Sequence, residues 1–559
     1  MPAFGDPAFE PRFILGQFNT GDADLVKTER SRESGQLRSQ CGELVGGEIA
    51  CHGGGEWLAA SIITRMESVP ALVYAAAQVR AMDRHAIDVI GIPGYTLMQR
   101  AAEAALALLR QQWPEANRIT VLCGSGNNAG DGYVLARLAR DAGLPVSTCA
   151  VVDPLRLAGD AARAYADFTA AGGRDSGFSG TGLAATDVVV DALLGTGVDR
   201  PVEGAMRDCI DAVNASGLPV LALDLPSGLD ADTGLIHGSA IAATRTITFV
   251  ALKAGLFLGD AWDCVGELAF AGLGIPEAAC EAQAPVIRRM EGRLLEAALP
   301  KRRRSAHKGD HGRVLIVGGL AMDGAVRLAG EAALRTGAGL VTVATDAASV
   351  ASIIAGRPEL ICSAVKSAAE LERLINAADA VAIGPGLGLG RSARDVFGTV
   401  AGCGKALVVD ADALTLLAEK PQQRDDWILT PHPGEAARLL GTDAATVQRD
   451  RLGSARAIAA RYGGVCVLKG AGTLVALKES LPWICDCGNP GMATAGAGDV
   501  LTGIIAALVA GGCELERAAT AGVLLHARAG DRAARAGERG LVASDLIAQL
   551  QAVVNPPWN

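Results

Sequence analysis

Two glycine-rich stretches, each containing an aspartate, are the features of this sequence best suited to chemistry. Residues 124–132 read GSGNNAGDG and contain Asp131, and residues 488–503 read GNPGMATAGAGDVLTG and contain Asp499. The second stretch leads into an apolar run typical of a helix, so unpaired N–H groups at the helix start can hold a developing negative charge. Asp499 beside them can accept a proton from a substrate hydroxyl while the amides stabilise a transferring phosphoryl group. The alternative is an aspartate that only caps a buried helix.

The upstream stretch lies in ITVLCGSGNNAGDGYVLARLA, which reads as strand, glycine turn and helix. Such a turn lets backbone N–H groups face a phosphate. It is not a Walker A loop, because no Lys-Ser/Thr pair follows the glycine, so β/γ-phosphate chemistry is not expected here.

Further polar residues follow two other apolar segments. VVVDALLGTGVDRP contains Asp191 before a second glycine loop, and LALDLPSGLDADTG contains Asp224 and Ser227. Carboxyl ends of parallel strands meet at one edge of a doubly wound sheet, so these residues should converge with the pair Asn127 and Asn128. Together they could bind a cation or move a proton. Each acid alone could be a helix cap, but Asp131 and two more at one edge favour a site.

Two motifs that precede the second aspartate in the sequence contain residues that could bind a ligand. LKGAGTLV, residues 468–475, is a strand followed by a glycine turn that suits the phosphates or ribose of a nucleotide. TPHPGEAARLL places His432 and Glu435 in a turn that enters a helix. Prolines at 431 and 433 fix the backbone of His432, which favours a ligand contact over a purely structural histidine.

The elements that must position these residues alternate between short apolar runs and helical patterns. RITVLC, PVSTCAV, TDVVVDAL, PVLALDLP, TITFVAL and GELAFAG are the expected strands before residue 276. After a basic connector, residues 299–313, a second series begins at RVLIVGG and includes GLVTVAT, DAVAIGPG, KALVVDADAL, WILTPH and GVCVLKGAG. Near-continuous apolar strands separated by helices predict mainly parallel sheets covered on both faces. We therefore predict an α/β protein with two three-layer α/β/α domains, the first Rossmann-like.

The predicted boundaries follow shifts in composition. Residues 1–65 are rich in glycine and charge without sustained periodicity, and we expect a disordered or non-native extension. Residues 66–285 form the first domain, 286–312 a linker and lead-in segment, and 313–559 the second domain. The KRRR cluster at 301–304 is either a solvated linker or a feature that attracts an anionic ligand.

Composition excludes several classes of protein. Of 559 residues, 50% are hydrophobic and 20% are charged, which is typical of a folded chain. The net charge of -10 argues against general nucleic-acid binding. Thirteen cysteines are scattered without CxxC spacing, no apolar stretch is long enough for a membrane span, and no secretory signal is evident. We expect a cytoplasmic protein with reduced thiols that binds small molecules, and neither nucleic acid nor membrane.

The motifs resemble a known pair of domains. GSGNNAGDG, DALLGTGVDRP, DLPSGLDADTG and FVALKAG resemble the NAD(P)H-hydrate epimerase domain. AHKGDHGRVLIVGG, MDGAVRLAGEAALRTGAGLVTVAT, IGPGLG, DADAL, TPHPGEAARLL, LKGAGTLV and GNPGMATAGAGDVLTG resemble the ADP-dependent NAD(P)H-hydrate dehydratase domain, which has a ribokinase-like fold. In this order they resemble the bifunctional bacterial enzymes that repair hydrated nicotinamide cofactors. The resemblance covers nearly everything from residue 66 onward.

The resemblance implies a function for each domain. Hydrated NADH or NADPH carries water across a double bond of the nicotinamide ring and cannot donate hydride. The first domain would interconvert the R and S hydrates, and the second would dehydrate the S form at the expense of ADP. We expect Asp499 to act as base while ADP phosphorylates the hydrate's hydroxyl, after which phosphate leaves. Magnesium is expected with the nucleotide, and the family resemblance implies a homo-oligomer.

The resemblance also implies site residues. The expected proton-transferring residues are Asp224 and Asp499. The epimerase substrate site would be formed by Asn127, Asn128, Ala129, Gly130, Asp131, Gly195, Thr196, Gly197, Val198, Asp199, Arg200, Pro201 and Asp224. A potassium ion would be held by Asn128, Asp191 and Ser227. The dehydratase would bind the hydrate through Ala325, Gly386 or Gly388, His432 and Asp499, and the nucleotide through Lys469, Gly470, Ala471, Gly472, Thr473 and Gly498.

One position departs from the family pattern, and one rival function remains. Leu320 stands in VGGLAMDG where a serine usually follows the glycine pair, which could weaken a polar contact near the hydrate. The ribokinase-like motifs alone would also permit a kinase of a vitamin-precursor alcohol. The first domain could then be a nucleotide-sensing or oligomerisation module.

Overall fold

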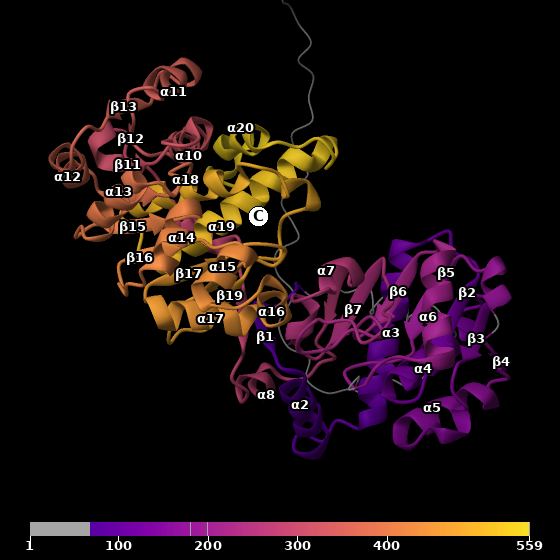
Figure 1. Ribbon diagram of the computed structural model, residues 1–559. Coiled ribbons are helices and arrows are strands. Elements are labelled where there is room, and N and C mark those ends of the chain that lie inside the picture. The colour runs from indigo at the N-terminus through magenta and orange to yellow at the C-terminus, as the bar shows by residue number, and fades with distance from the viewer. Residues whose placement is uncertain (1–67, 179, 198–199, 558–559) are drawn as a thin grey trace, which may run out of the picture. The chain divides into compact units, whose positions relative to one another are not determined.

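The computed structural model describes residues 68–178, 180–197 and 200–557, and these residues form two β-sheets (Figure 1). The expectation for residues 1–65 lies outside the described residues. Both sheets are built mainly from parallel strands with helices on both faces, which confirms the predicted α/β class with two sheets.

The N-terminal sheet has seven parallel strands. Its central strands do not alternate between buried and exposed residues. β2, β5 and β6 are buried at every position, because helices cover both faces. In spatial order the strands are β4 (Asp175–Gly177), β3 (Val146–Ala150), β2 (Ile119–Cys123), β5 (Val188–Ala192), β6 (Val220–Leu223), β7 (Arg245–Phe249) and β9 (Glu267–Ala271).

The helices of this half pack on the two faces of the sheet. One face carries α2 (Ala76–Asp88), α3 (Gly94–Gln112), α4 (Asn127–Asp141) and α5 (Gly159–Ala170). The opposite face carries α6 (Gly204–Ser216). Two short helices, α7 (Ala261–Cys264) and α8 (Glu277–Glu281), flank the last strand.

The order of these strands fixes where a ligand can bind. The chain runs outward from β2 through β3 to β4, then returns to β5 on the other side of β2 and continues to β6, β7 and β9. The neighbouring strands β2 and β5 are therefore the switch point, and the loops that follow them open a crevice. The GSGNNAGDG turn follows β2, and the LGTG loop follows β5.

The second sheet has its own switch point between β11 and β14. Its order is β13 (Ile361–Ala364), β12 (Leu340–Thr345), β11 (Arg313–Val317), β14 (Ala380–Ile383), β15 (Ala406–Val409), β16 (Trp427–Leu429), β17 (Val465–Leu468), β18 (Leu474–Ala476) and β19 (Trp483–Ile484). Strands β13 to β17 pair in parallel, while β18 and β19 pair antiparallel. Three further short strands, β10 (Ile287–Arg289), β1 (Leu72–Tyr74) and β8 (Leu252–Lys253), continue this sheet beyond β19. These three strands were not predicted.

Two helical layers cover the second sheet. One contains α9 (Arg293–Ala298), α10 (Asp323–Thr336), α11 (Val350–Gly356), α18 (Ala497–Ala510), α19 (Leu515–Ala533) and α20 (Ala543–Val553). The other contains α12 (Ala368–Ala377), α13 (Arg391–Ala401), α14 (Ala411–Glu419), α15 (Pro433–Leu440), α16 (Ala444–Arg449) and α17 (Arg451–Tyr462). In the described part of the chain, every helix is too short or too polar to cross a lipid bilayer.

Helix α18 is apolar around almost its whole circumference because it lies between the sheet and other helices. Gly503 lets it approach α10 closely: a Cβ there would lie 2.0 Å from the carbonyl oxygen of Ala329. The glycine in VLTG is therefore a packing requirement of the helix whose start carries Asp499.

Gly503→Ala should lower the free energy of unfolding by about 1–3 kcal/mol, because the added methyl group forces α10 and α18 apart. Gly398→Ala is the matched control: this glycine also lies within a helix, but a Cβ there meets nothing within 4 Å. The control should be neutral or stabilising by up to about 1 kcal/mol. Urea unfolding of both variants measures the difference, and equal stability would contradict the packing argument.

Candidate active sites

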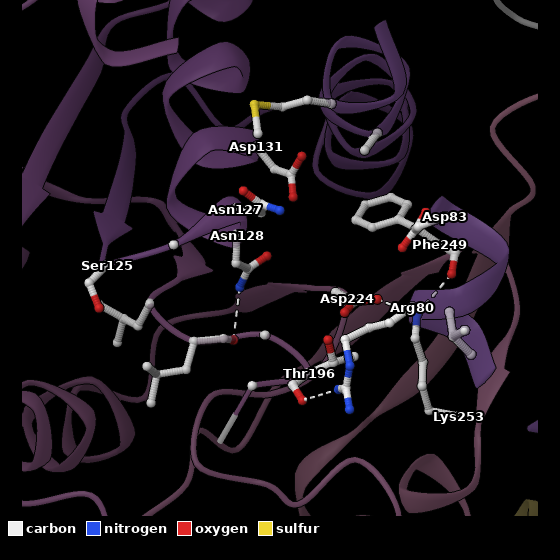
Figure 2. A pocket seen from close by; sticks show the side chains of 18 of the residues that line it. Arg80, Asp83, Ser125, Asn127, Asn128, Asp131, Thr196, Asp224, Phe249 and Lys253 are labelled. Carbon is white, nitrogen blue, oxygen red and sulfur yellow. Dashed lines mark hydrogen bonds and ion pairs between the residues drawn. The ribbon is translucent and has the colours of Figure 1, made fainter. Parts of the chain in front are cut away.

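A cavity of about 830 Å³ opens at the switch point of the N-terminal sheet. Figure 2 shows polar side chains from several elements that converge on it. Of the residues expected to form the first site, the cavity is lined by Asn127, Asn128, Asp131, Gly195, Thr196, Gly197, Arg200, Pro201 and Asp224. We call this cavity and its lining the N-terminal site.

Two expected residues of this site, Ala129 and Gly130, do not line the cavity. Ala129 is buried in α4, and a Cβ at Gly130 would collide with the side chain of Met98, so these two serve packing against α3. The sequence pattern could not separate them from their neighbours, because successive residues of a helix face different directions. Val198 and Asp199 lie outside the described residues.

Of the three expected potassium ligands, only Asn128 lines the cavity, whereas Asp191 and Ser227 are fully buried and do not line it. The carboxylate of Asp191 is fully buried and accepts hydrogen bonds from Ser227 N at 2.8 Å, Ser227 Oγ at 2.5 Å and Leu193 N at 3.2 Å. Burial nevertheless raises the pKa of Asp191 to about 6. Asn128 donates from Nδ2 to Leu194 O at 2.8 Å, whereas its buried Oδ1 has no partner. A buried acceptor without a donor is what a cation would satisfy.

A buried ion pair joins Asp224 to Lys253, which is only 1% exposed. Lys253 Nζ donates to Asp224 Oδ1, to Thr248 Oγ1 at 3.0 Å and to Phe249 O at 2.8 Å, so all three of its protons are used. Asp224 has a φ of +67°, a strained conformation for a residue other than glycine, and its carboxyl faces the cavity (Figure 2). Lys253 was given no role in the sequence analysis, although it lies in the quoted FVALKAG motif. A single lysine within an apolar run could have indicated that it is buried with a partner.

Two further carboxyls face the cavity. Asp131 on α4 was expected there, whereas Asp83 on α2 was missed. Asp83 falls on the apolar stripe of its helix, four residues after Val79 and seven after Ala76. A carboxyl at such a position could have been recognised from the sequence as a candidate site residue. Burial raises the pKa of Asp83 to about 6 and that of Asp131 well above its usual range, with further contributions from the neighbouring carboxylates. Arg80, one turn earlier on α2, lines the cavity and donates to Thr196 O at 3.1 Å.

In the second half, Asp499 occupies the first turn of α18. The helix begins after Gly496, whose φ is +87°, so the preceding turn exposes the N–H groups of the helix start. The carboxyl has no hydrogen-bond partner among the described residues and is not a helix cap. Burial raises the pKa of Asp499 to about 7, and Asp410 adds to the shift. This carboxyl can therefore take up and release a proton near neutral pH.

A buried ion pair lies beside this helix start. Lys469 Nζ donates to Asp410 Oδ1 at 2.6 Å, and Thr502 Oγ1 donates to Asp410 Oδ2 at 2.7 Å. Burial alone would lower the pKa of Lys469, but the charges of Asp410 and Glu435 outweigh it and raise that pKa. A Cβ at Gly498 would lie 3.3 Å from Lys469 Nζ, so glycine keeps the lysine accessible from α18.

His432 has a structural task in addition to the ligand contact that we expected. It is the N-cap of α15: its Nδ1 accepts from Gly434 N at 3.0 Å and Glu435 N at 3.3 Å, and Glu435 Oε2 accepts from His432 N at 2.8 Å. Because Nδ1 is an acceptor, the neutral ring carries its proton on Nε2. His432 Nε2 lies 3.5 Å from Glu435 Oε1, and the side chain is 52% exposed, so a ligand can still reach the ring.

The remaining expected residues lie on one helix and in two loops. Gly386 and Gly388 have φ of +59° and +78°, and Gly388 N donates to Asp412 Oδ2 at 2.7 Å. Ala325 is buried in the first turn of α10. Gly470, Ala471, Gly472 and Thr473 form the turn after β17. We call this cluster around Asp499 and Lys469 the C-terminal site.

Two side chains of the C-terminal site, Asp410 and His526, were given no role in the sequence analysis, and Leu320 was expected to weaken a polar contact. Asp410 lay in the quoted DADAL motif without an assigned role. His526 Nε2 contacts Ala497 O at 2.9 Å, and burial lowers the pKa of His526 to about 4, so the neutral ring donates and holds the start of α18. Leu320, the departure from the family pattern, packs against the hydrophobic core and offers no polar contact. Within the described residues, no three His, Cys, Asp or Glu side chains are grouped to hold a metal ion.

Comparisons with known proteins match both halves. A family model described as NAD(P)H-hydrate dehydratase matches residues 314–552, and one described as YjeF-related protein N-terminus matches residues 94–255. A protein of Coxiella burnetii named bifunctional NAD(P)H-hydrate repair enzyme Nnr is 47% identical over 487 residues, covering 87% of this chain and 100% of that protein. Its namesake from Escherichia coli is 45% identical over 491 residues, covering 88% of this chain and 95% of that protein.

A solved structure is also similar to the second half. The ADP/ATP-dependent NAD(P)H-hydrate dehydratase from Bacillus subtilis, co-crystallised with ATP/Mg2+, is 28% identical. The match covers 47% of this chain and 97% of that chain, with a TM-score of 0.42.

The raised pKa of Asp499 predicts a stability that depends on pH. The folded state binds this proton more tightly than the unfolded state, so the contribution to stability is complete below about pH 4 and is lost as the pH rises through about 7. Asp499→Asn cannot ionise and should melt at a higher temperature than the wild type at pH 8, with a smaller difference at pH 5. Thermal melting at both pH values, with the exposed Asp395→Asn as control, measures this. A difference that is the same at both values would contradict the shift.

Proposed function

The chain belongs to the family of bifunctional NAD(P)H-hydrate repair enzymes, and from this premise we propose that the N-terminal site performs the epimerisation and the C-terminal site the dehydration. The protein is therefore an enzyme with two activities that act on hydrated NADH and NADPH. The observation that supports the division of labour is that each half has its own switch-point site with its own carboxyls and its own buried lysine.

Dehydration requires a better leaving group than hydroxide. We propose that Asp499 accepts the proton of the hydrate's hydroxyl while that oxygen attacks the β-phosphorus of ADP, and that the bond from phosphorus to the AMP oxygen breaks. The ring nitrogen's lone pair then expels phosphate, and loss of a proton from the adjacent carbon restores the ring double bond. The products are the reduced cofactor, AMP, phosphate and a proton.

Several groups support this assignment of the C-terminal site. The amides at the start of α18 can stabilise charge on the transferring phosphoryl group, and Lys469 offers an ammonium beside them. The glycine turn of residues 469–473 is the proposed nucleotide loop. Magnesium bound to the nucleotide phosphates would neutralise part of their charge. Gly386, Gly388, Ala325 and His432 Nε2 are the proposed contacts to the hydrate.

For the N-terminal site we propose Asp224 as a proton-transferring residue, because its carboxyl faces the cavity on a strained backbone. We also propose that the unpartnered Oδ1 of Asn128 would hold a potassium ion together with Asp191 and Ser227; Asn128 and Ser227 both donate to Leu194 O, which brings them close together. Such a cation would compensate the buried negative charge of Asp191. We further propose a homo-oligomer, as the family resemblance implies.

Asp499→Asn should lower the dehydratase rate by about 100-fold or more, because the amide cannot accept a proton, and should leave epimerisation intact. The assay supplies the full-length variant with the S hydrate and ADP and follows the absorbance of the reduced nicotinamide. Conversion of pure R hydrate to S hydrate tests the other half. Asp395→Asn, an exposed aspartate on α13, is the control for both reactions. Full dehydratase activity in Asp499→Asn would reject this residue as the base.

Product analysis distinguishes this function from the kinase alternative. A kinase of a vitamin-precursor alcohol leaves a stable phosphorylated alcohol, whereas the repair reaction releases inorganic phosphate for each reduced cofactor formed. Phosphorus NMR of a completed reaction should therefore show AMP and phosphate in equal amounts. A persistent phosphate ester would support the kinase.

A further inference from the structure

Epimerisation imposes a requirement that one carboxyl does not meet. The hydroxyl-bearing carbon lies next to the ring nitrogen, whose lone pair can expel water once the hydroxyl is protonated. Inversion then requires a second water to add to the other face of the ring and lose a proton there. Two proton-handling groups at separate positions serve the two faces. Asp224 supplies one of them, given that the N-terminal site is the epimerase.

Asp83 is placed to be the second group. It lies on α2, whereas Asp224 follows β6, so the two carboxyls reach the cavity from separate elements (Figure 2). The carboxyl of Asp83 has no hydrogen-bond partner among the described residues, although it occupies the apolar stripe of its helix. A carboxyl in that position is costly to bury and has no hydrogen bond within the fold to offset the cost, which argues for a role toward a ligand.

The alternative second group, Asp131, differs in its surroundings. It lies within the first two turns of α4, in the glycine-rich turn that follows β2 and that suits a phosphate. Asp83 instead lies beside Phe249 (Figure 2). The backbone oxygen of Phe249 accepts a hydrogen bond from Lys253, which is the partner of Asp224. After burial, the largest effect on the pKa of Asp83 is that of Lys253, which favours its charged form, whereas for Asp131 it is the like charge of Asp224.

We propose that Asp83 is a catalytic acid–base residue of the epimerase, acting together with Asp224 on the hydroxyl and water that leave and return at the epimerised carbon. Protonated Asp83 gives its proton to the hydroxyl, the carbon–oxygen bond breaks, and the nitrogen lone pair forms a carbon–nitrogen double bond. Water leaves. A second water adds from the other face, the double-bond electrons return to nitrogen, and Asp224 takes the proton of that water. The reverse reaction exchanges the two roles, and solvent resets the protons.

The charges around Asp83 agree with this role. The titratable and charged groups that influence it are Asp131 on α4, Asp224 after β6, Lys253 on β8, Cys280 on α8, and Arg84 on its own helix. Burial raises the pKa of Asp83 to about 6, Lys253 lowers it and Asp224 raises it. Since a group that must both give and take a proton works best near the ambient pH, a pKa of about 6 suits Asp83 to the task.

The test uses the full-length enzyme and pure R hydrate, with R and S separated by chromatography. Asp83→Asn should lower the epimerase kcat by about 100-fold or more with little change in KM, and should abolish the limb of the pH profile near pH 6. Asp83→Glu, which restores a carboxyl, should recover part of the rate and a shifted limb. Asp88→Asn, an exposed aspartate on the same helix, should behave as wild type.

Two controls keep the outcome interpretable. Dehydration of the S hydrate by the same variants shows that the protein is folded, and failure of the wild type to epimerise would reject the site assignment rather than Asp83. Epimerisation in water enriched in oxygen-18 should place the label in the S product. The proposal is overturned by a wild-type kcat in Asp83→Asn, by a change confined to KM, by an unlabelled S product, or by an Asp131→Asn variant that alone loses the pH limb. If Asp83→Asn does not fold, the position of the pH limb in Asp83→Glu decides: an unshifted limb overturns the proposal.

Discussion

A buried ammonium paired with an aspartate at a strand end organises each site of this protein. Lys253 pairs with Asp224 in the first half, and Lys469 pairs with Asp410 in the second. Moving either charge out of water costs several kcal/mol, and only a close opposite charge with further hydrogen bonds offsets that cost. Lys253 pairs with one carboxylate, and Lys469 lies near a second one, Glu435, at 3.8 Å. Burial raises the pKa of Asp83 and of Asp499, and the lysines offset only part of the shift, which gives both acids protons that can move near neutral pH.

The two halves use this arrangement differently. The first surrounds its cavity with side chains, and its catalytic problem is the movement of protons and water at one carbon. The second places Asp499 on the exposed amides of a helix start, where negative charge on a phosphoryl group can be stabilised. In both halves the strands are buried on both faces, so the carboxyl edge at the switch point is the part of the sheet open to polar groups. The strand order therefore determines where each site lies, and the residues of the loops after the strands determine which reaction it can catalyse.

Much of this arrangement could be predicted from the sequence because it is local. Strands such as ITVLC, and glycine turns that precede helices, can be recognised from a few residues. They place Asp131 and Asp224 at the edge of the first sheet where the cavity opens, and Asp499 at the start of α18. Two-residue and three-residue strands such as β19 and β10 carry too little pattern to be seen, since their existence depends on a neighbour far away in the chain. Ala129 and Gly130 were assigned to the cavity because a motif does not show which way each helical residue faces.

The missed side chains share one physical cause. Asp83 and Lys253 are charges within apolar patterns, and the reason they tolerate burial is a partner or cavity supplied by another element. His432 shows the converse case, because its Nδ1 accepts hydrogen bonds from the local backbone and its Nε2 faces Glu435, so much of its role is set by neighbours in sequence. A polar residue in an apolar stripe is thus the more informative signal, since burial without a function would cost stability.

The strands β10, β1 and β8, which come from residues before 290, extend the second sheet past β19. A gene split at the basic connector would leave the edge of β19 with unpaired N–H and C=O groups, and such edges invite aggregation. Because both active sites lie on one polypeptide, they are always made in equal numbers. Cells that make this protein cannot adjust the two repair steps separately by changing how much of each half they synthesise.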